Sequence, residues 1–306
     1  MKKKYDAIII GAGAAGVSAA IWGKRLDLDI LLVEKENGVG GQLYRVGNPI
    51  IDYPGVRVNH GKELAALLQE HLSALQVPVL QAEVAQIDPL HKQVITSKGS
   101  FFCDYLILAT GARDKRLHIP GEQAMLSRGE QYSTTKERHQ FAGKKVLVVG
   151  GGDRAIEGVL NVADVAEHTW LVHRSSQFRA QQRFIEAVQA HPNVTLLMES
   201  HLIEIGDETA LKTVRLSVQG NERTIPMDRV LIRIGMEPDN QLVREIVQIQ
   251  ENGSIEIDAI CRTSVPWIFA IGDVVTAPEY RSVSWSVGQG MVASKSILVE
   301  LMQKRE

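Results

Sequence analysis

Two glycine-rich segments have the residue types and the spacing of phosphate-binding turns. Residues 11–16 read GAGAAG and residues 150–155 read GGGDRA. In each turn the first position permits a tight turn, the middle position lets the backbone approach a pyrophosphate, and the last allows a helix to pack closely on a strand. These positions are Gly11, Gly13 and Gly16 in the first turn, and Gly150, Gly152 and Ala155 in the second. Because free N–H groups and the helix dipole favour negative charge there, the sequence predicts two dinucleotide sites.

The residue that ends the strand after each turn indicates which dinucleotide binds. Glu34 ends the first of these strands, and a carboxylate there accepts hydrogen bonds from an unphosphorylated ribose, as in FAD or NAD. His173 stands at the equivalent position of the second unit and is followed by Arg174, with Arg179 nearby. These basic side chains would attract a 2′-phosphate, so the second site favours NADPH over NADH. The alternative for Arg174 and Arg179 is a solvated basic helix start.

Thiol chemistry has little support in this sequence. The two cysteines, Cys103 and Cys261, are far apart along the chain and stand in no paired motif. Both adjoin strand-like segments, so we expect them to pack as small hydrophobic residues. A disulfide framework and a cysteine-based zinc site are therefore excluded. We predict no metal site, and the cysteine usage favours a cytoplasmic location.

Each turn must be held by a strand before it and a helix after it. Apolar segments at 7–10 and 146–149 precede the turns, Ala-rich helical patterns follow them, and second apolar strands are predicted at 30–33 and 169–172. Each set is a βαβ unit of about 30 residues, the building block of dinucleotide-binding folds. Further strands are predicted within 104–112, 230–238 and 263–275, and a final helix at 288–302. The chain of 306 residues is long enough for two domains, or for one interrupted by another.

The composition is that of an ordinary globular protein. Hydrophobic residues make up 44% and charged residues 23% of the chain, and the formal net charge is −2. This charge gives no global attraction to nucleic acid or to an anionic membrane. The basic start MKKK precedes an apolar run, but Asp6 interrupts it and the run ends in the first glycine turn, so we expect no export signal. No apolar run approaches the roughly 18 residues of a membrane-spanning helix.

Several further motifs occur together in one order along the chain. They are GGQL at 40–43, DYPG at 52–55, ATGA at 109–112, GGGDRAIE at 150–157, HRSSQFR at 173–179, IGMEPDN at 234–240, TSVPWIFAIGD at 263–273 and YRSVSWSVGQG at 280–290. With GAGAAG, they make the chain resemble the low-molecular-weight thioredoxin reductases and their relatives over essentially its whole length.

The resemblance implies an α/β fold of two Rossmann-like, three-layer β/β/α nucleotide-binding domains. The NAD(P) domain, at 116–238, would be inserted into an FAD-binding domain formed by 1–115 and 239–306. The resemblance also implies a homodimer, and two domains that can rotate relative to each other.

Cofactor-binding residues follow from the same resemblance. For FAD they are Gly11, Gly13, Ala14, Ala15, Gly16, Glu34, Lys35, Gly41, Gln42, Leu43, Asn48, Ala109, Thr110, Gly111, Gly272, Asp273, Ser282, Val283 and Gln289. For NAD(P)H they are Gly150, Gly152, Asp153, Arg154, Ala155, His173, Arg174, Arg179 and Gly235. Gln42 would pass beside the flavin, Asp273 would accept a hydrogen bond from a ribityl hydroxyl, and Gln289 would lie near the pyrimidine edge of the ring. NADPH is the expected nicotinamide cofactor, with NADH as the alternative.

The departures from the family decide the chemistry. Both sulfurs of its Cys-x-x-Cys are absent, because the chain has at those positions Ser133, Thr134, Thr135 and Lys136. Only a thiolate attacks flavin or disulfide sulfur productively, so the usual reduction of thioredoxin is excluded and no catalytic side chain is assigned. Ser175 replaces an arginine of the family, and Arg154, which replaces a small residue, would either contact a phosphate or crowd it.

The sequence thus predicts an FAD-dependent NAD(P)H oxidoreductase that passes electrons from flavin directly to an external acceptor. The acceptor would be a small molecule or an acidic carrier such as ferredoxin or flavodoxin, because the chain is similar to the ferredoxin/flavodoxin–NADP reductases of this fold in lacking the dithiol. The alternatives are reduction of a disulfide supplied by a partner, a flavin reduced by another donor such as ferredoxin, and a non-catalytic flavin-binding protein.

Two features bear on the acceptor. Residues 113–145 include eight basic and four acidic residues, which form either a basic face that steers an acidic carrier or an ordinary solvated surface. The chain ends directly after its final predicted helix, without the C-terminal extension that covers the flavin in those reductases. Trp285 or Tyr280 could serve as a cover, but we expect both to pack in the core.

Overall fold

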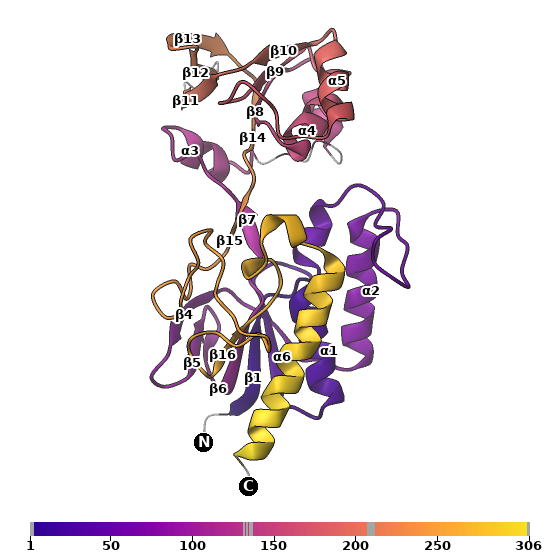
Figure 1. Cartoon of the computed structure of the whole chain (residues 1–306), viewed down its shortest axis with the longest axis vertical. Helices are drawn as coiled ribbons and strands as arrows, with labels where there is room; N and C mark the ends of the chain where they lie inside the picture. Colours follow the sequence, from indigo (N-terminus) through magenta and orange to yellow (C-terminus); the bar gives the residue numbers. More distant parts are fainter. Residues whose placement is uncertain (1–2, 131, 133, 135–136, 207–211, 305–306) are drawn as a thin grey trace. The chain divides into compact units, whose positions relative to one another are not determined.

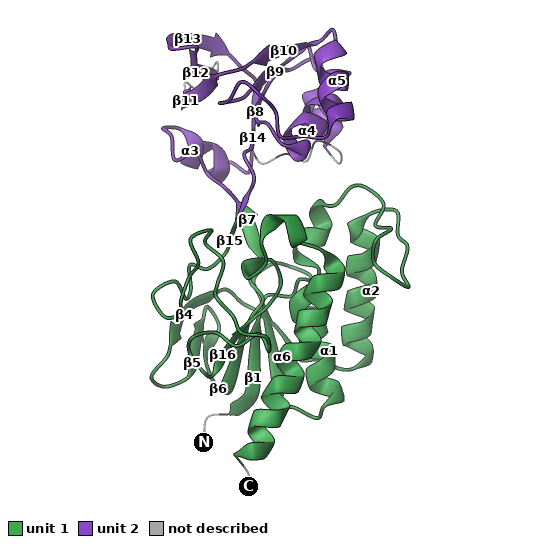
Figure 2. Ribbon diagram, viewed as in Figure 1, with its two compact units in different colours: residues 1–113, 237–306 green, residues 114–236 purple. Residues whose placement is uncertain are grey.

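The chain forms two compact units, one inserted into the other. The computed structural model describes residues 3–130, 132, 134, 137–206 and 212–304. Unit 1 contains residues 1–113 and 237–306, and unit 2 contains residues 114–236 (Figure 2). These bounds lie within two residues of the expected ones. The two segments that connect the units pair with each other as β7 (Ala112–Asp114) and β15 (Met236–Pro238).

Unit 1 is built on a seven-stranded sheet in the order β3-β2-β1-β6-β5-β4, with β16 beside β6. Its strands are β1 (Lys4–Ile10), β2 (Ile30–Glu34), β3 (Val79–Gln81), β4 (Val84–Asp88), β5 (Gln93–Thr96), β6 (Gly99–Leu108) and β16 (Ile268–Ala270). Its helices are α1 (Ala14–Arg25), α2 (Gly61–Ala74) and α6 (Val283–Gln303), with short 3-10 turns η1 (Gly41–Arg45), η3 (Gly272–Val274) and η4 (Pro278–Tyr280). Strands β1, β2, β6 and β16 are parallel, so their carboxyl ends meet at one edge, where such folds bind dinucleotides.

Small residues let two helices of unit 1 pack closely. Helices α1 and α6 lie side by side (Figure 1). A Cβ added at Gly290 of α6 would lie 2.7 Å from the Ala15 carbonyl oxygen of α1. The Ser18 hydroxyl donates to the Val287 carbonyl (2.7 Å), and the Ser294 hydroxyl donates to the Ala19 carbonyl (2.8 Å). The last helix of the chain is thus fixed against the helix that follows the first glycine turn.

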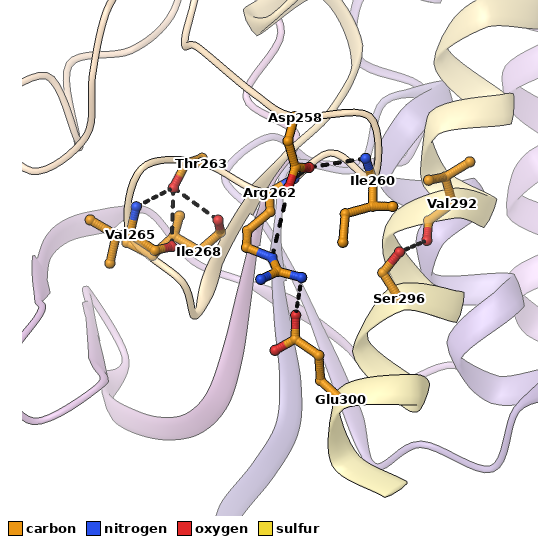
Figure 3. A network of polar contacts seen from close by, with 9 residues as sticks. All are labelled: Asp258, Ile260, Arg262, Thr263, Val265, Ile268, Val292, Ser296 and Glu300. Carbon is orange, nitrogen blue, oxygen red and sulfur yellow. Dashed lines mark hydrogen bonds and ion pairs between the residues drawn. The ribbon is translucent and has the colours of Figure 1, made fainter. Parts of the chain in front are cut away.

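A polar network holds the segment before β16 against α6 (Figure 3). The Arg262 guanidinium pairs with Glu300 of α6 at 2.7 Å and lies 4.0 Å from Asp258. The Asp258 carboxylate accepts from the backbone N–H groups of Ile260 and Arg262, both at 2.9 Å. The Thr263 hydroxyl donates to the Ile268 carbonyl at 2.9 Å. These contacts hold the chain just before β16, the strand that leads to Gly272 and Asp273.

Unit 2 contains two sheets and three α-helices within its described residues. The parallel sheet has the order β10-β9-β8-β14 and the antiparallel sheet the order β11-β12-β13. Its strands are β8 (Lys145–Gly150), β9 (His168–Val172), β10 (Val194–Leu197), β11 (Ser200–Gly206), β12 (Thr213–Val218), β13 (Asn221–Pro226) and β14 (Arg229–Arg233). Its helices are α3 (Glu122–Ser127), α4 (Asp153–Ala163), α5 (Gln182–Ala190) and the 3-10 turn η2 (Arg138–Phe141).

Alternation along β8 separates the three layers of unit 2. Val146 and Val148 pack on Ile156 of α4, in a core that lies between the parallel sheet and its helices. Leu147 and Val149 point to the other face, in a core shared with β11 and β12. Successive side chains of a strand point to opposite faces, so one strand fills both cores. The expected three-layer β/β/α arrangement is confirmed.

Three elements differ most from their predicted bounds. The final helix begins at Val283 rather than near Gly288, because the Ser282 hydroxyl caps it by accepting from the Trp285 N–H (3.1 Å). Strand β6 begins at Gly99 rather than residue 104, because its first residues pair antiparallel with β5. Of the segment 263–275, only Ile268–Ala270 pairs as a strand, with β6.

Candidate functional site

The first glycine turn lies between β1 and α1 and leaves room for a ligand at one position. A Cβ at Gly11 (φ +100°) would lie 2.4 Å from the Ala109 carbonyl oxygen, and one at Gly16 would lie 1.9 Å from the Gly11 carbonyl oxygen. A Cβ at Gly13 would meet nothing within 4 Å. Gly11 and Gly16 are therefore required by the protein's own packing, whereas the space at Gly13, the N-cap of α1, is open for an anion.

Glu34 closes this turn from the end of β2. Its Oε2 accepts from the Ala12 N–H at 2.7 Å, its Oε1 accepts from the Glu36 N–H at 2.9 Å, and the side chain is buried. Each carboxylate oxygen can accept a further hydrogen bond, so the group can still receive a ribose hydroxyl. The contact with Ala12 was not predicted, although the expected position of Glu34 beside the turn implies it. Lys35 is exposed.

Residues from distant parts of unit 1 meet beyond the turn. Gln42 of η1 donates from Nε2 to the Ala112 carbonyl (3.0 Å) and to Asp273 Oδ2 (3.4 Å). Burial raises the pKa of Asp273, and the charge of Arg281 opposes this shift. A buried carboxylate that is not fully compensated favours a hydroxyl donor beside it. The structure thus brings Gln42 and Asp273 together.

The other predicted FAD residues occupy the same unit in different surroundings. Gly41 approaches the first turn, since its Cβ would lie 3.3 Å from the Gly13 Cα. The Thr110 hydroxyl donates to the Asp239 carbonyl at 2.6 Å, so it supports the backbone rather than pointing freely at a ligand. Leu43 is buried, Ala14 and Val283 are half-buried, and Asn48 and Ser282 are exposed. Gly111 takes a positive φ of 73°.

Gln289 links α6 to the turn that holds Asp273. Its Oε1 accepts from the Gly272 N–H at 2.8 Å, and the side chain is only 7% exposed. Gly272 has a φ of +78°, and a Cβ there would lie 2.9 Å from Ala15 Cβ. The close approach of η3 to α1 therefore depends on this glycine.

The second glycine turn repeats the first in unit 2. A Cβ at Gly150 would lie 2.3 Å from the Arg233 carbonyl oxygen, whereas one at Gly152, the N-cap of α4, would meet nothing within 4 Å. Ala155 is fully buried. Gly235 has a φ of +100° and open space around it. The open middle position again marks where a pyrophosphate fits.

Asp153 and Arg154 make contacts within unit 2 that the sequence did not reveal. Asp153 Oδ1 accepts from the Gln181 N–H at 2.7 Å, and its Oδ2 accepts from the Gln181 side chain at 3.2 Å. Arg154 donates to Asp114 Oδ1 at 3.4 Å. Asp153 therefore fixes the loop before α5, and Arg154 is directed to a carboxylate rather than to the glycine turn.

His173 has a packing role, contrary to its predicted part in attracting a phosphate. The ring is buried, stacks on Phe178 (centroids 5.3 Å apart) and donates from Nε2 to the Gln177 carbonyl at 3.0 Å. A Cβ at Gly151 would lie 2.1 Å from the ring. The imidazole thus fills the space beneath the glycine turn, and its Nε2 proton is already used.

The two arginines near His173 remain candidates for a phosphate. Arg174 and Arg179 are exposed. The Arg179 backbone N–H donates to the Gly151 carbonyl at 2.8 Å, which holds this residue beside the second turn. Neither guanidinium makes an ion pair with any residue that the structure describes.

The cysteines are inert packing residues. Burial raises the pKa of Cys103 to about 12 and that of Cys261 to about 11. Both are buried and free. Ser133, Thr135 and Lys136, where the family has its dithiol, lie outside the described residues. Thr134 is half-buried, and its methyl group is 3.6 Å from the position a Cβ would take on Gly158 of α4.

Tyr280 and Trp285 are not core residues, so that expectation was wrong. Tyr280 is 72% exposed and Trp285 is 54% exposed. Both line a pocket at the start of α6. Trp285 lies in the first turn of α6, which the Ser282 hydroxyl caps.

Half of the basic residues in the stretch 113–145 are paired with carboxylates. Four of its basic residues pair with carboxylates of their own unit. The pairs are Arg113 with Glu237 (2.8 Å), Arg128 with Glu130 (2.7 Å), Arg138 with Asp164 (2.8 Å) and Lys145 with Glu167 (3.6 Å). Such paired groups offer little free positive charge for steering an acidic carrier.

Among the described residues, no group of three or more His, Cys, Asp or Glu side chains is arranged to hold a metal ion. Within the same described ranges, every helix is too short or too polar to cross a membrane.

Comparison with known proteins places these sites in one family. Residues 5–290 match the pyridine nucleotide-disulphide oxidoreductase family. The chain is 32% identical over 298 residues to a 34.2 kDa protein in the rubredoxin operon of Clostridium pasteurianum, and the match covers 96% of each chain. It is 32% identical over 299 residues to thioredoxin reductase of Treponema pallidum, again covering 96% of each.

Structural comparison agrees with the sequence matches. The crystal structure of Lactococcus lactis thioredoxin reductase is similar with a TM-score of 0.83 and 30% identity, over 97% of this chain and 99% of that one. The two glycine turns, the inserted unit and these matches together show that the chain belongs to the pyridine nucleotide-disulphide oxidoreductases, as a member similar to the thioredoxin reductases.

Proposed function

We propose that the protein is an FAD-dependent NAD(P)H oxidoreductase that delivers electrons from flavin to an external acceptor without a dithiol of its own. The observation that carries this proposal is the pair of glycine turns, each open at its middle position and each at the N-terminus of a helix. FAD, when bound, accepts a hydride and releases electrons in pairs or singly.

The residues of unit 1 fit FAD. The backbone N–H groups after Gly13 would bind the pyrophosphate, and Glu34 would accept from the adenosine ribose. Asp273, whose pKa is raised by burial, would accept a hydrogen bond from a ribityl hydroxyl while Gln42 Nε2 donates to its Oδ2. Gln289 is fixed through Gly272 at the start of the same turn.

The residues of unit 2 fit a nicotinamide dinucleotide. The turn at Gly152 would bind its pyrophosphate, and the exposed guanidinium groups of Arg174 and Arg179 would bind a 2′-phosphate. NADPH is therefore the proposed donor. Unit 2 has no carboxylate equivalent to Glu34 that would repel this phosphate, because His173 occupies that position.

The acceptor must take electrons without help from a protein disulfide. The chain has hydroxyl residues and a lysine where the family has its Cys-x-x-Cys, and hydroxyls do not cycle between reduced and oxidised forms. Cys103 and Cys261 do not replace the pair, since burial keeps both thiols protonated at neutral pH. The similarity to a protein of a rubredoxin operon is consistent with an electron carrier as one acceptor class. We also propose a homodimer.

Anaerobic mixing tests this function. The purified flavin-containing protein is mixed with NADPH and, separately, with NADH, and the absorbance of oxidised flavin is followed. We expect NADPH to bleach the flavin within seconds. If neither nucleotide bleaches it, the proposal fails, and reduction by ferredoxin or a non-catalytic role takes its place. If the protein reduces disulfide substrates but no other electron acceptor, the result would instead support reduction of a disulfide supplied by a partner.

A further inference from the structure

The second glycine turn carries a positive charge that the first turn lacks. Arg154 stands where the first turn has Ala15. Both positions lie in the first turn of a helix whose N-cap glycine, Gly13 or Gly152, faces open space. A helix N-terminus of this kind favours an anion, and a guanidinium beside it adds to the attraction. Arg154 is thus a candidate ligand for the pyrophosphate that is proposed to bind at this turn.

In the structure a carboxylate holds the Arg154 guanidinium instead. Arg154 Nη1 donates to Asp114 Oδ1 at 3.4 Å, and the two side chains are 50% and 31% exposed. One long hydrogen bond between partly exposed groups is weak, and it changes an equilibrium constant by at most about fivefold. A pyrophosphate carries more negative charge, and its hydrogen bonds with a guanidinium are short and charge-assisted. The guanidinium would therefore leave Asp114 for a bound dinucleotide.

Asp114 lies where the chain enters unit 2. It is the last residue of β7, which leads out of unit 1 and pairs with β15, the strand by which the chain returns. The next residue, Lys115, donates its backbone N–H to the Gly235 carbonyl at 3.0 Å. Gly235 is also one of the residues predicted for the nicotinamide nucleotide. The end of β7 therefore contacts two parts of that site, one through a side chain and one through the backbone.

The preceding residue of β7 is held independently of the glycine turn. Arg113 pairs with Glu237 of β15 at 2.8 Å and lies 3.9 Å from Asp239, and all three residues belong to unit 1. This ion pair does not involve Arg154. Release of Asp114 would therefore loosen the end of β7 while leaving its ion pair with β15 in place.

We propose that Arg154 is shared between Asp114 and the pyrophosphate of a bound dinucleotide, so that nucleotide binding releases the end of β7 from α4. The inference rests on the proposed function, because it needs a nucleotide at the second glycine turn. Such coupling is reciprocal. The contact with Asp114 weakens nucleotide binding by the same factor by which the nucleotide weakens this contact. Occupancy of the site in unit 2 is thereby transmitted to a strand that connects the two units.

Binding of NADP+ to the oxidised, flavin-containing protein tests this competition without electron transfer. Calorimetric titration gives the dissociation constant for the wild type, Asp114→Asn, Arg154→Gln and the double variant. We expect Asp114→Asn to bind NADP+ about two- to fivefold more tightly, because the guanidinium no longer has to leave a carboxylate. Arg154→Gln should bind at least about fivefold more weakly. In the Arg154→Gln background, Asp114→Asn should have no further effect.

Asp164→Asn is the matched control. Asp164 is the C-cap of the same helix, α4, and pairs with the exposed Arg138 at 2.8 Å. The variant thus removes the same charge and the same kind of ion pair at the other end of the helix. We expect its dissociation constant for NADP+ to stay within about 1.5-fold of the wild-type value, because solvent and salt screen distant charges. Tightening equal to that in Asp114→Asn would assign the effect to net charge and overturn the proposal.

Hydrogen exchange reports the release of β7. The exchange rate of a peptide that covers residues 112–116 is measured with and without saturating NADP+. We expect NADP+ to raise this rate at least about twofold in the wild type and to leave it unchanged in Arg154→Gln. Nucleotide-free Asp114→Asn should already exchange as fast as the nucleotide-bound wild type.

Three further results would overturn the inference and leave the proposed function intact. They are NADP+ binding that Asp114→Asn does not tighten, an effect of Asp114→Asn that persists in the Arg154→Gln background, and exchange at 112–116 that NADP+ leaves unchanged or slows. The second would show that Asp114 repels the phosphates directly. Wild-type protein that binds neither NADP+ nor NAD+ would overturn both the inference and the proposed function.

Discussion

The two glycine turns share their spacing but are closed in different ways. In unit 1 the strand-end residue Glu34 reaches back and accepts from the turn backbone at Ala12. In unit 2 the equivalent residue, His173, packs beneath Gly151 and donates to the Gln177 carbonyl. The first turn therefore has a carboxylate beside it that can accept a hydrogen bond from a ligand. Beside the second turn, the groups exposed to a ligand are the guanidinium groups of Arg174 and Arg179. On the proposed function, the βαβ frame would bind a pyrophosphate in both units, and the residue at the end of the second strand would select the rest of the nucleotide.

The largest effect is expected from Gly16→Ala. The new Cβ would lie 1.9 Å from the Gly11 carbonyl oxygen, so the turn must shift. We expect the free energy of unfolding to fall by about 1–3 kcal/mol or more and the purified protein to lose most of its flavin. Thermal unfolding and the flavin-to-protein absorbance ratio measure this.

Gly13→Ala is the matched control for that change. A Cβ at Gly13 meets no protein atom within 4 Å. We therefore expect unaltered unfolding of flavin-free protein, but weaker flavin binding, because the methyl group would occupy the space of the pyrophosphate. Full flavin content in both variants would mean that this turn does not hold the cofactor.

Glu34→Ala tests the carboxylate hydrogen-bond acceptor that distinguishes unit 1 from unit 2. The change leaves the Ala12 and Glu36 N–H groups without their acceptor, at a cost of roughly 1–3 kcal/mol for a buried donor. We expect lower stability and lower flavin occupancy, measured by denaturant titration and flavin absorbance. The neighbouring exposed residue gives the control, since Glu36→Ala should alter neither quantity.

Arg174→Gln together with Arg179→Gln tests the recognition expected of unit 2. Hydrogen bonds to a charged group contribute about 1.5–3 kcal/mol, so we expect KM for NADPH to rise at least tenfold and KM for NADH to change little. Both side chains are exposed, so thermal unfolding should be unaffected. Arg183→Gln, at an exposed arginine of α5, is the control. An equal rise in KM for NADPH and for NADH would argue against a 2′-phosphate site.

The smallest effect is expected from the cysteines. Cys103→Ala and Cys261→Ala should leave NADPH-dependent turnover unchanged at neutral pH. The pKa values of these thiols are raised from 9.0 to about 12 and about 11, so the unfolded chain loses these protons first as pH rises. Their contribution to stability is complete below pH 9 and is lost as pH rises towards 11 and 12.

Denaturant titrations at pH 8 and pH 10.5 check this. The decrease in the free energy of unfolding from pH 8 to pH 10.5 should be smaller in a variant that carries both Cys103→Ala and Cys261→Ala than in the wild type. An equal loss, or rapid alkylation of either thiol in the folded wild type at pH 8, would contradict the buried assignment.

Much of the site could be predicted because its signals are local. Gly11 and Gly150 must take positive φ values next to a strand, and their spacing to Gly16 and Ala155 follows from the geometry of one turn and one helix. The start of α6 was missed although a local signal existed, since a serine at position 282 before an apolar run is a common helix cap. Gly288 and Gly290 obscured it, because glycine lowers helix propensity.

The two βαβ units with their glycine turns, the missing dithiol and the residue at the end of each second strand can be read from the amino-acid order alone. Three features appear only in the folded chain: His173 is buried, Gln42 meets Asp273 across 231 residues of sequence, and Trp285 lines a pocket. Neighbouring residues dictate a backbone turn, whereas burial and side-chain partners depend on segments that folding brings together.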